Sequence, residues 1–224
     1  MKGAFIGLAL LGAAFVMPAA ALADTPQHLV DSATLSLQDI MGAPGNTQVG
    51  ELLRKARAVV VCPNIFRAGF ILGGEGGGCL MLARDAQGGW SDPAFYTLGS
   101  GSFGFQAGVQ SAEVVMIVMT EGGLNALLNS QFKFGADAGL TVATLGAGVN
   151  GSLSTALDAD IVSISKTEGL YGGISLQGSI LNSDSGTDAD YYSADYDARQ
   201  IVLGLHGTNP GANPLRAALG RYGG

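Results

Sequence analysis

The fold is decided around the stretch Gly73-Gly74-Glu75-Gly76-Gly77-Gly78, which lies between the apolar runs Gly69–Leu72 and Leu80–Arg84. Short apolar runs bounded by glycine are typical of β-strands. Glycine weakens a strand, but it permits bulges, tight bends and the close approach of another backbone. The stretch therefore predicts a small, strongly curved or closed β-sheet.

Glycine is abundant throughout the chain, with 36 glycines among 224 residues, whereas an average protein has about 7 %. Hydrophobic residues make up 47 % and charged residues 13 %, which excludes a disordered acidic chain because such chains lack apolar residues. The sequence has no Gly-X-Y period, which excludes collagen. The composition indicates a domain that buries a core.

The charge balance excludes one class of partner. The chain has 11 Lys and Arg against 18 Asp and Glu, and its net charge is −7. Binding to nucleic acid phosphates depends on clustered basic residues. We therefore expect no nucleic acid partner.

The N-terminus has the pattern of a secretory signal peptide. Lys2 is followed by an apolar segment from Ala4 to Met17 and then by Ala21-Leu22-Ala23, an A-x-A cleavage site. A membrane-spanning helix needs about 20 apolar residues, and this segment is shorter. We predict that residues 1–23 are removed and that residues 24–224 form a single exported domain, periplasmic or secreted.

The two cysteines, Cys62 and Cys79, lie in what read as neighbouring strands. An exported chain meets an oxidising compartment, where a disulfide between them would persist. Cysteine is also often a small buried apolar residue. Both interpretations stay open at this stage.

Helical spacing of apolar residues predicts an amphipathic helix over Gln27–Met41 and a second, shorter helix over Val49–Ala56. A third short helix is expected over Gly123–Gln131. The helical N-terminal part is thus placed at residues 27–57.

The following part, residues 58–205, is predicted to be rich in β-structure. Ala58–Cys62 reads as a strand that Pro63 stops, and Val114–Met119 reads as a strand buried on both faces. Alternating apolar residues predict further strands over residues 103–110, 132–142 and 172–180. We predict an α+β fold with a mainly antiparallel, Gly-rich, curved or barrel-like sheet.

No motif indicates catalysis. Two G-x-G-x-x-G strings begin at Gly99 and Gly146, but at this glycine content about one match is expected by chance. The chain has no G-x-S-x-G elbow, HExxH or Walker A string, and Glu75 is a lone acid that reads as fixing a turn. We predict that the protein is not an enzyme and has no cofactor.

Acidic residues gather between Asn182 and Asp197, around Tyr191-Tyr192. This segment reads as a solvated loop, and it lacks the alternating acidic spacing of an EF-hand calcium loop. We therefore expect no metal site there.

Several longer runs resemble the SYLF lipid-binding domain family. The matches extend over nearly the whole predicted mature chain, and the most extended of them are Leu52–Pro63, Trp90-Ser91-Asp92-Pro93-Ala94-Phe95, Gly101–Gly108, Phe134–Ala138 and Gly169–Ser179. The resemblance implies a mostly β domain with flanking helices, and binding rather than catalysis. Eukaryotic members bind phosphoinositide membranes and some bundle actin, while exported bacterial members are regarded as lipid-binding proteins.

This resemblance implies a phospholipid or membrane surface as the partner. The eukaryotic members use a basic N-terminal helix, whereas residues 24–53 contain no Lys or Arg here. Actin is not expected, because an exported protein would not meet it. The candidate lipid-binding residues are an apolar helix face and the local basic residues: Leu29, Leu37, Ile40, Met41, Arg54, Lys55, Arg57 and Arg67.

Two alternatives remain. The apolar face is also compatible with packing on the sheet, and the basic residues with capping a helix, which is the commoner role for any one such residue. The protein could also be a structural or protein-interaction module of the cell envelope without a lipid ligand, using a sheet edge or the Tyr191-Tyr192 segment.

Overall fold

The computed structural model describes residues 25–43, 47–69, 72–103, 108–136, 141–146, 158–168 and 176–223. The helices are α1 (Pro26–Gly42), α2 (Thr47–Lys55), α3 (Glu121–Leu127), α5 (Ser185–Tyr192), α6 (Ala198–Val202) and α7 (Asn213–Gly223), with the 3-10 turn η1 (Pro210–Ala212). The strands are β1 (Ala58–Gly69), β2 (Leu72–Ala83), β3 (Ala94–Phe103), β4 (Gly108–Val118), β5 (Gln131–Lys133), β6 (Val142–Gly146), β7 (Ile161–Glu168) and β8 (Ile180–Ser183). The predicted signal peptide lies outside the described residues.

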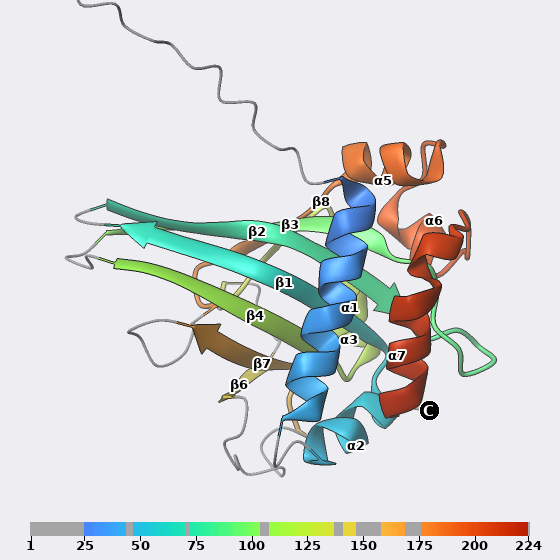
Figure 1. Ribbon diagram of the computed structural model, residues 1–224, viewed down its shortest axis with the longest axis horizontal. Coiled ribbons are helices and arrows are strands. Elements are labelled where there is room, and N and C mark those ends of the chain that lie inside the picture. The colour runs from blue at the N-terminus through green and yellow to red at the C-terminus, as the bar shows by residue number, and fades with distance from the viewer. Residues whose placement is uncertain are drawn as a thin grey trace, which may run out of the picture.

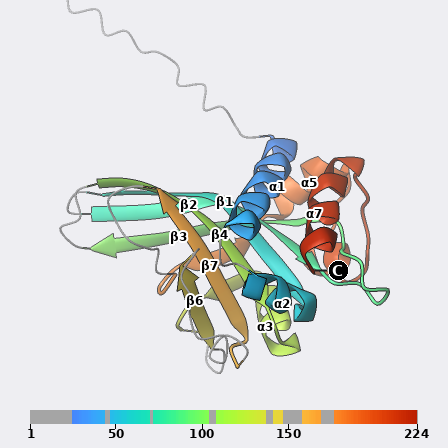
Figure 2. The same ribbon diagram turned by 60° about the horizontal axis from the view of Figure 1, so that its bottom comes forward.

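The strands form one eight-stranded sheet in the order β5-β8-β3-β2-β1-β4-β7-β6. Neighbouring strands are antiparallel, apart from the parallel pair of β6 and β7. Figure 2 shows β7 running obliquely across the direction of β1, as a strongly curled sheet requires. The predicted α+β class and the mainly antiparallel, curved sheet are confirmed.

The two faces of the sheet bury different side chains, because successive residues of a strand point to opposite sides. Val61, Leu80 and Val115 pack with α1, α2 and α7 on one face, which we call the outer face. Met81 and Met116 pack with α3, α6 and β5 on the other, inner face. Strand β4 is buried on both faces, as its continuous apolar run predicts.

The predicted N-terminal helices are also confirmed. The side chain of Thr25 accepts a hydrogen bond from the backbone N–H of His28 and so caps α1. Val30, Ala33 and other apolar residues of α1 are buried against the sheet. None of the described helices has the length and apolar character that crossing a membrane requires.

Strand β1 continues through Pro63, so the prediction that this proline ends the strand is wrong. The register with β4 shifts between Cys62 and Ile65, which leaves Pro63 and Asn64 opposite Glu113. Such a bulge tolerates proline because the extra residue needs no ladder hydrogen bond.

The glycine stretch is the middle of the 12-residue strand β2 and does not separate two strands. A Cβ atom on Gly77 would lie 2.1 Å from the carbonyl oxygen of Asn64, and one on Gly78 would lie 2.8 Å from Cδ2 of Leu29 in α1. Both distances are shorter than van der Waals contact allows. Glycine is therefore required at position 77, where the backbone of the bulge approaches β2, whereas at position 78 the end of the Leu29 side chain would have to move.

A disulfide joins Cys62 in β1 to Cys79 in β2, with a Cα–Cα distance of 4.2 Å. Cys62 directly precedes the bulge in β1, and Cys79 directly follows Gly78 in β2. The bond therefore fixes the pairing of β1 and β2 where their register is irregular.

Beyond α1 the four central strands project as an arm, away from α7 (Figures 1 and 2). We define the arm as residues 66–69, 72–76, 99–103 and 108–111. The only charged residues in these ranges are Arg67 and Glu75, which are cross-strand partners. By strand alternation both belong to the inner face, so the outer face of the arm carries no charge.

Several predicted strands differ in extent. In place of a strand over 132–142, β5 ends at Lys133 and a turn follows, in which Gly135 has φ +82°. The alternations over 103–110 and 172–180 lie partly outside the described residues. Of their described residues, Phe103 belongs to β3, residues 108–110 to β4 and Ile180 to β8, whereas residues 176–179 form a turn in which Gly178 has φ +84°.

The C-terminal helices were missed, and the prediction of a solvated acidic loop around Tyr191-Tyr192 is wrong. The side chain of Asp184 caps α5, and Asp197 forms a capping box with Gln200 at the start of α6. The ring of Tyr191 is buried against Phe95, with centroids 5.0 Å apart. Asp184 and Asp197 thus serve as helix caps, whereas Asp188 is buried and Asp190 and Asp195 are exposed.

Arg84, just after β2, joins the ends of two helices. Its Nη2 donates to the carbonyl oxygens of Leu53 in α2, at 2.9 Å, and Gly223 in α7, at 3.0 Å. The guanidinium also stacks 4.4 Å from the centre of the Trp90 ring. Carbonyls at helix C-termini lack intrahelical partners, and a cation there is favoured.

The close contact at Gly77 leads to a first prediction. Gly77→Ala should lower the free energy of unfolding by about 2–3 kcal/mol, because either the bulge or β2 must move. Gly101→Ala is the matched control, since a Cβ there meets nothing within 4 Å. Urea denaturation of both variants measures the difference, and equal stabilities would contradict the assigned contact.

The disulfide leads to a second prediction. Its cysteines are 17 residues apart, and closing a loop of this length stabilises a fold by about 3 kcal/mol. The double variant Cys62→Ala, Cys79→Ala should lose about this much in urea denaturation. Dithiothreitol should destabilise the native protein to a similar extent and leave the double variant unchanged.

Candidate functional site

A groove of about 320 Å³ lies between α1 and the strands β1, β4 and β7. Helix α1 forms one wall, and the bulge of β1 with the neighbouring part of β4 forms the floor. Its lining residues are Ser32, Leu35, Ser36, Pro63, Asn64, Ser111, Ala112, Glu113 and Lys166.

The floor of the groove is polar. Oγ of Ser36 lies 3.0 Å from Oε1 of Glu113 and 3.4 Å from the carbonyl oxygen of Pro63. The hydroxyl of Ser111 donates to Oδ1 of Asn64 at 2.8 Å. The bulge makes this arrangement possible, because it turns Pro63 and Asn64 toward α1.

Three charged groups interact at one end of the groove. Lys166 of β7 forms an ion pair with Asp39 of α1, and the hydrogen bond from Lys166 lowers the pKa of the Asp39 carboxyl. Burial raises the pKa of the Glu113 carboxyl, and the nearby negative charge of Asp39 raises it further. A hydrogen bond between the carboxyls of Glu113 and Asp39 also raises the pKa of Glu113 and lowers that of Asp39, and Oε2 of Glu113 is buried.

Two large apolar side chains are exposed in or beside the groove. Leu35 lines it from α1 and is 66 % exposed. Phe66 on the outer face of the arm is 50 % exposed and pairs across the strands with Ser111, which lines the groove floor. Sequence analysis missed both, because Leu35 lies off the apolar face of α1 and Phe66 follows the unexpected bulge.

The apolar residues predicted to bind lipid lie mostly in the core. Leu37 and Ile40 are fully buried against the sheet, while Leu29 and Met41 are partly buried and pack on the same cluster. For Leu37 and Ile40 the lipid-binding prediction is wrong in this conformation. Their amphipathic spacing reflects packing of α1 on β1, β2 and β4.

The predicted basic residues do not form one cluster. Arg54 and Lys55 are exposed at the end of α2, and Arg57 lies 3.4 Å from Glu121. Arg67 lies ten positions along the chain from Arg57, which corresponds to roughly 30 Å in an extended strand. Placing Arg67 with the others was therefore wrong.

Glu75 is inside a strand and fixes no turn. Its carboxylate lies 3.3 Å from Nε of Arg67 and accepts a hydrogen bond from Ser179 at 2.8 Å. These contacts pair the buried charge, as burial requires. Within the described ranges, no three His, Cys, Asp or Glu residues gather as a metal site.

Comparison with known families decides the classification. Residues 99–222, more than half of the chain, match the family model Ysc84, described as "Las17-binding protein actin regulator". The chain belongs to the Ysc84 (SYLF) family. The resemblance inferred from sequence is thereby confirmed.

Proteins of eukaryotes are among the curated relatives of this SYLF protein. "SH3 domain-containing YSC84-like protein 1" of Rattus norvegicus is 29 % identical over 154 residues, covering 68 % of this chain and 45 % of the relative. "LAS seventeen-binding protein 3" of Saccharomyces cerevisiae is 24 % identical over 174 residues, covering 75 % and 37 %. The chain thus spans less than half the length of these relatives.

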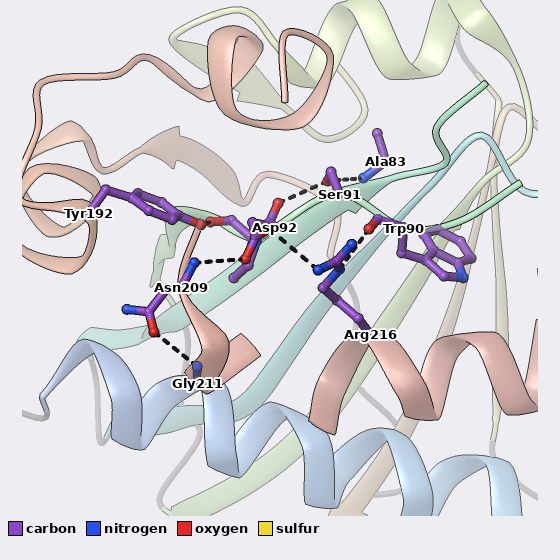
Figure 3. A network of polar contacts seen from close by, with 9 residues as sticks. Ala83, Trp90, Ser91, Asp92, Tyr192, Asn209, Gly211 and Arg216 are labelled. Atoms are coloured by element: carbon purple, nitrogen blue, oxygen red, sulfur yellow. Dashed lines mark hydrogen bonds and ion pairs between the residues drawn. The ribbon is translucent and has the colours of Figure 1, made fainter. Parts of the chain in front are cut away.

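The SYLF motif Trp90–Phe95 has a structural role (Figure 3). Asp92 lies 3.6 Å from Nη1 of Arg216 and accepts a hydrogen bond from the backbone N–H of Asn209 at 3.3 Å. Arg216 also donates to the carbonyl of Trp90 at 2.8 Å, and Tyr192 donates to that of Pro93 at 2.6 Å. These contacts anchor α5, η1 and α7 beside the sheet.

Asp188 adds a further contact to those that hold α5 beside the sheet. It is fully buried, and its Oδ1 accepts a hydrogen bond from the backbone N–H of Phe95 at 2.9 Å. Burial raises its pKa from 3.8 to about 7. Between these two pKa values the folded state keeps the proton of Asp188 and the unfolded state loses it. The contribution of Asp188 to the free energy of unfolding is therefore fully present at low pH and is lost as pH rises through about 7.

We therefore predict that stability depends on pH through Asp188. Relative to Asp188→Asn, the native protein should lose up to about 1.4 kcal/mol per pH unit between roughly pH 4 and pH 7. Urea denaturation of both proteins at several pH values measures this difference. A pH-independent difference would contradict a buried, protonated Asp188.

Proposed function

We propose that this SYLF protein is an exported, non-catalytic protein that binds lipid surfaces through the outer face of its arm and the adjoining groove. The observation that carries the proposal is the exposure of Leu35, which lines the groove, and of Phe66, whose cross-strand partner Ser111 lines it. Phe66 lies on the charge-free outer face of the arm, whereas Leu35 lies on α1, four residues from both Asp31 and Asp39. Exposed apolar side chains of this kind are suited to inserting into a lipid surface. The apolar face of α1 packs on the sheet, so we assign the contact with lipid to the arm.

The expected binding is weak and reversible. Burying a Leu or Phe side chain fully contributes about 1.5–3 kcal/mol, so two partly exposed side chains contribute about 2–4 kcal/mol together. The outer face of the arm has no basic residue. We therefore expect binding that depends little on salt or on anionic lipid.

Export is part of the proposal. It is supported by the A-x-A pattern before Asp24 and by the disulfide, since disulfides persist in oxidising compartments. A periplasmic or secreted location with peripheral membrane attachment is consistent with both features.

Co-sedimentation of the mature protein with phosphatidylcholine vesicles tests this proposal. The double variant Leu35→Ser, Phe66→Ser should bind about tenfold or more weakly. Leu203→Ser, at a 43 % exposed site after α6, should bind as the native protein does. Adding salt should change little.

Two results would contradict lipid binding through the arm. If replacing Arg54, Lys55 and Arg57 together by Gln abolished a salt-sensitive binding, the basic residues and not the arm would carry the function. If the native protein bound no vesicle, lipid-surface binding would be wrong.

A protein-interaction role in the cell envelope is the second candidate. It is favoured by the names of the family and its yeast relative, which refer to Las17 binding. Cross-linking without lipid that recovered one envelope protein, and lost it on replacing Phe66, would support this role. The absence of actin as a partner stays a prediction, because the family description includes actin regulation.

A further inference from the structure

Asp188 of α5 is a buried acid whose second oxygen has no partner. Its Oδ1 accepts the hydrogen bond from the backbone N–H of Phe95, whereas Oδ2 is buried and accepts no hydrogen bond from the described residues. Burial without a paired cation or full hydrogen bonding disfavours the charged form of a carboxyl group. The neutral acid is therefore the form that fits while α5 lies on β3.

Among the described residues, no cation is paired with Asp188. The titratable groups that face Asp188 or the neighbouring Tyr191 are acids and tyrosines: Tyr96 of β3, Asp184 and Tyr192 of α5, Asp197 of α6, Asp31 of α1 and Asp92 before β3. Arginines act on two of these tyrosines, but Arg199 donates to Asn125 and Arg216 is paired with Asp92. Loss of the Asp188 proton therefore leaves a buried charge without a counter-ion.

Helix α5 covers an aromatic pair on the outer face of the sheet. The fully buried ring of Phe95 lies edge-on to Tyr191 of α5, with ring centroids 5.0 Å apart. Side-chain hydrogen bonds also hold the helix: Tyr192 donates to the carbonyl of Pro93 at 2.6 Å, and Tyr191 donates to Gln27 of α1 at 3.3 Å. Figure 1 shows α5 at the edge of the fold, beside the start of α1. A peripheral helix held by side chains opens more easily than a strand in the centre of a sheet.

We propose that α5 is a lid that opens when Asp188 releases its proton, uncovering Phe95 and Tyr191 beside the start of α1. This inference goes beyond the proposed function and does not rest on lipid binding. In the open state the carboxyl of Asp188 is solvated and ionises freely, whereas in the closed state it keeps its proton. Opening and proton release are therefore coupled.

The direction and size of the coupling follow from the two states of Asp188. Its pKa is about 7 while α5 is closed, and its ordinary value of 3.8 applies when α5 is open. The closed form is thus favoured at low pH, and the opening constant rises about tenfold per pH unit until it levels off near pH 7. From about pH 5 to about pH 7 we expect the opening constant to rise roughly 100-fold.

Hydrogen exchange of the mature protein, read by mass spectrometry without lipid, tests the lid. After correction for the pH dependence of intrinsic exchange, the amides of α5 should report an opening constant that rises roughly 100-fold between about pH 5 and about pH 7. The amides of the central strand β4 are the internal reference, because they exchange only when the sheet opens. The α5 amides should exchange faster than those of β4 at every pH.

Two variants assign the pH dependence to one carboxyl. Asp188→Asn keeps an oxygen for the N–H of Phe95 but cannot ionise, so its corrected exchange at α5 should not depend on pH. Asp190→Asn removes an exposed acid of the same helix and should behave as the native protein does. If Asp188→Asn does not fold, the native protein still decides, because a rise that comes from Asp188 must level off near pH 7.

Three results would overturn the lid. The corrected exchange of α5 in the native protein could be independent of pH. The rise could persist in Asp188→Asn, or continue undiminished beyond about pH 8. The α5 amides could exchange at the same rate as those of β4, which would make the opening global. Vesicle binding is measured separately, so each of these results leaves the proposed function as it stands.

Discussion

The backbone of the β1 bulge can approach β2 only because residue 77 of β2 has no side chain. Gly77 lies against the carbonyl of Asn64 in the bulge, and Gly78 lies against Leu29 of α1. Successive residues of a strand face opposite sides, so β2 is approached closely on both. The groove lies between the same helix and the same bulge. The shape of the groove is therefore set by how the backbone of the helix and the bulge packs, and not by the side chains that line the groove.

Much of the fold could be predicted from periodicity. The α1 helix and the doubly buried β4 have patterns with one structural solution each. The predictions were wrong where one residue type is compatible with two local structures. Pro63 ends most strands but is accommodated in a bulge, and the acids Asp184 and Asp197 indicate a solvated loop until they are seen to cap helices. Local sequence cannot separate these cases, because strand partners and burial decide between them.

The candidate site was less predictable for a related reason. An apolar helix face has the same spacing whether it contacts a membrane or a sheet, so Leu37 and Ile40 could be assigned to either. Leu35 and Phe66 interrupt no pattern and carry no motif. Their significance comes only from exposure beside the groove. Glu113 lies within an apolar strand, and its partners Asp39 and Lys166 come from segments far away in the sequence.

Arg84 has a consequence for how the molecule folds. One guanidinium binds the carbonyls of Leu53 and Gly223, residues near opposite ends of the described chain. The contact between α2 and α7 therefore forms only when almost the whole polypeptide is present, and the loop it closes is long. Contacts of such high sequence separation slow folding. If the chain is exported in an unfolded state, as we propose, slow formation of this contact leaves more time for translocation before the native structure is complete.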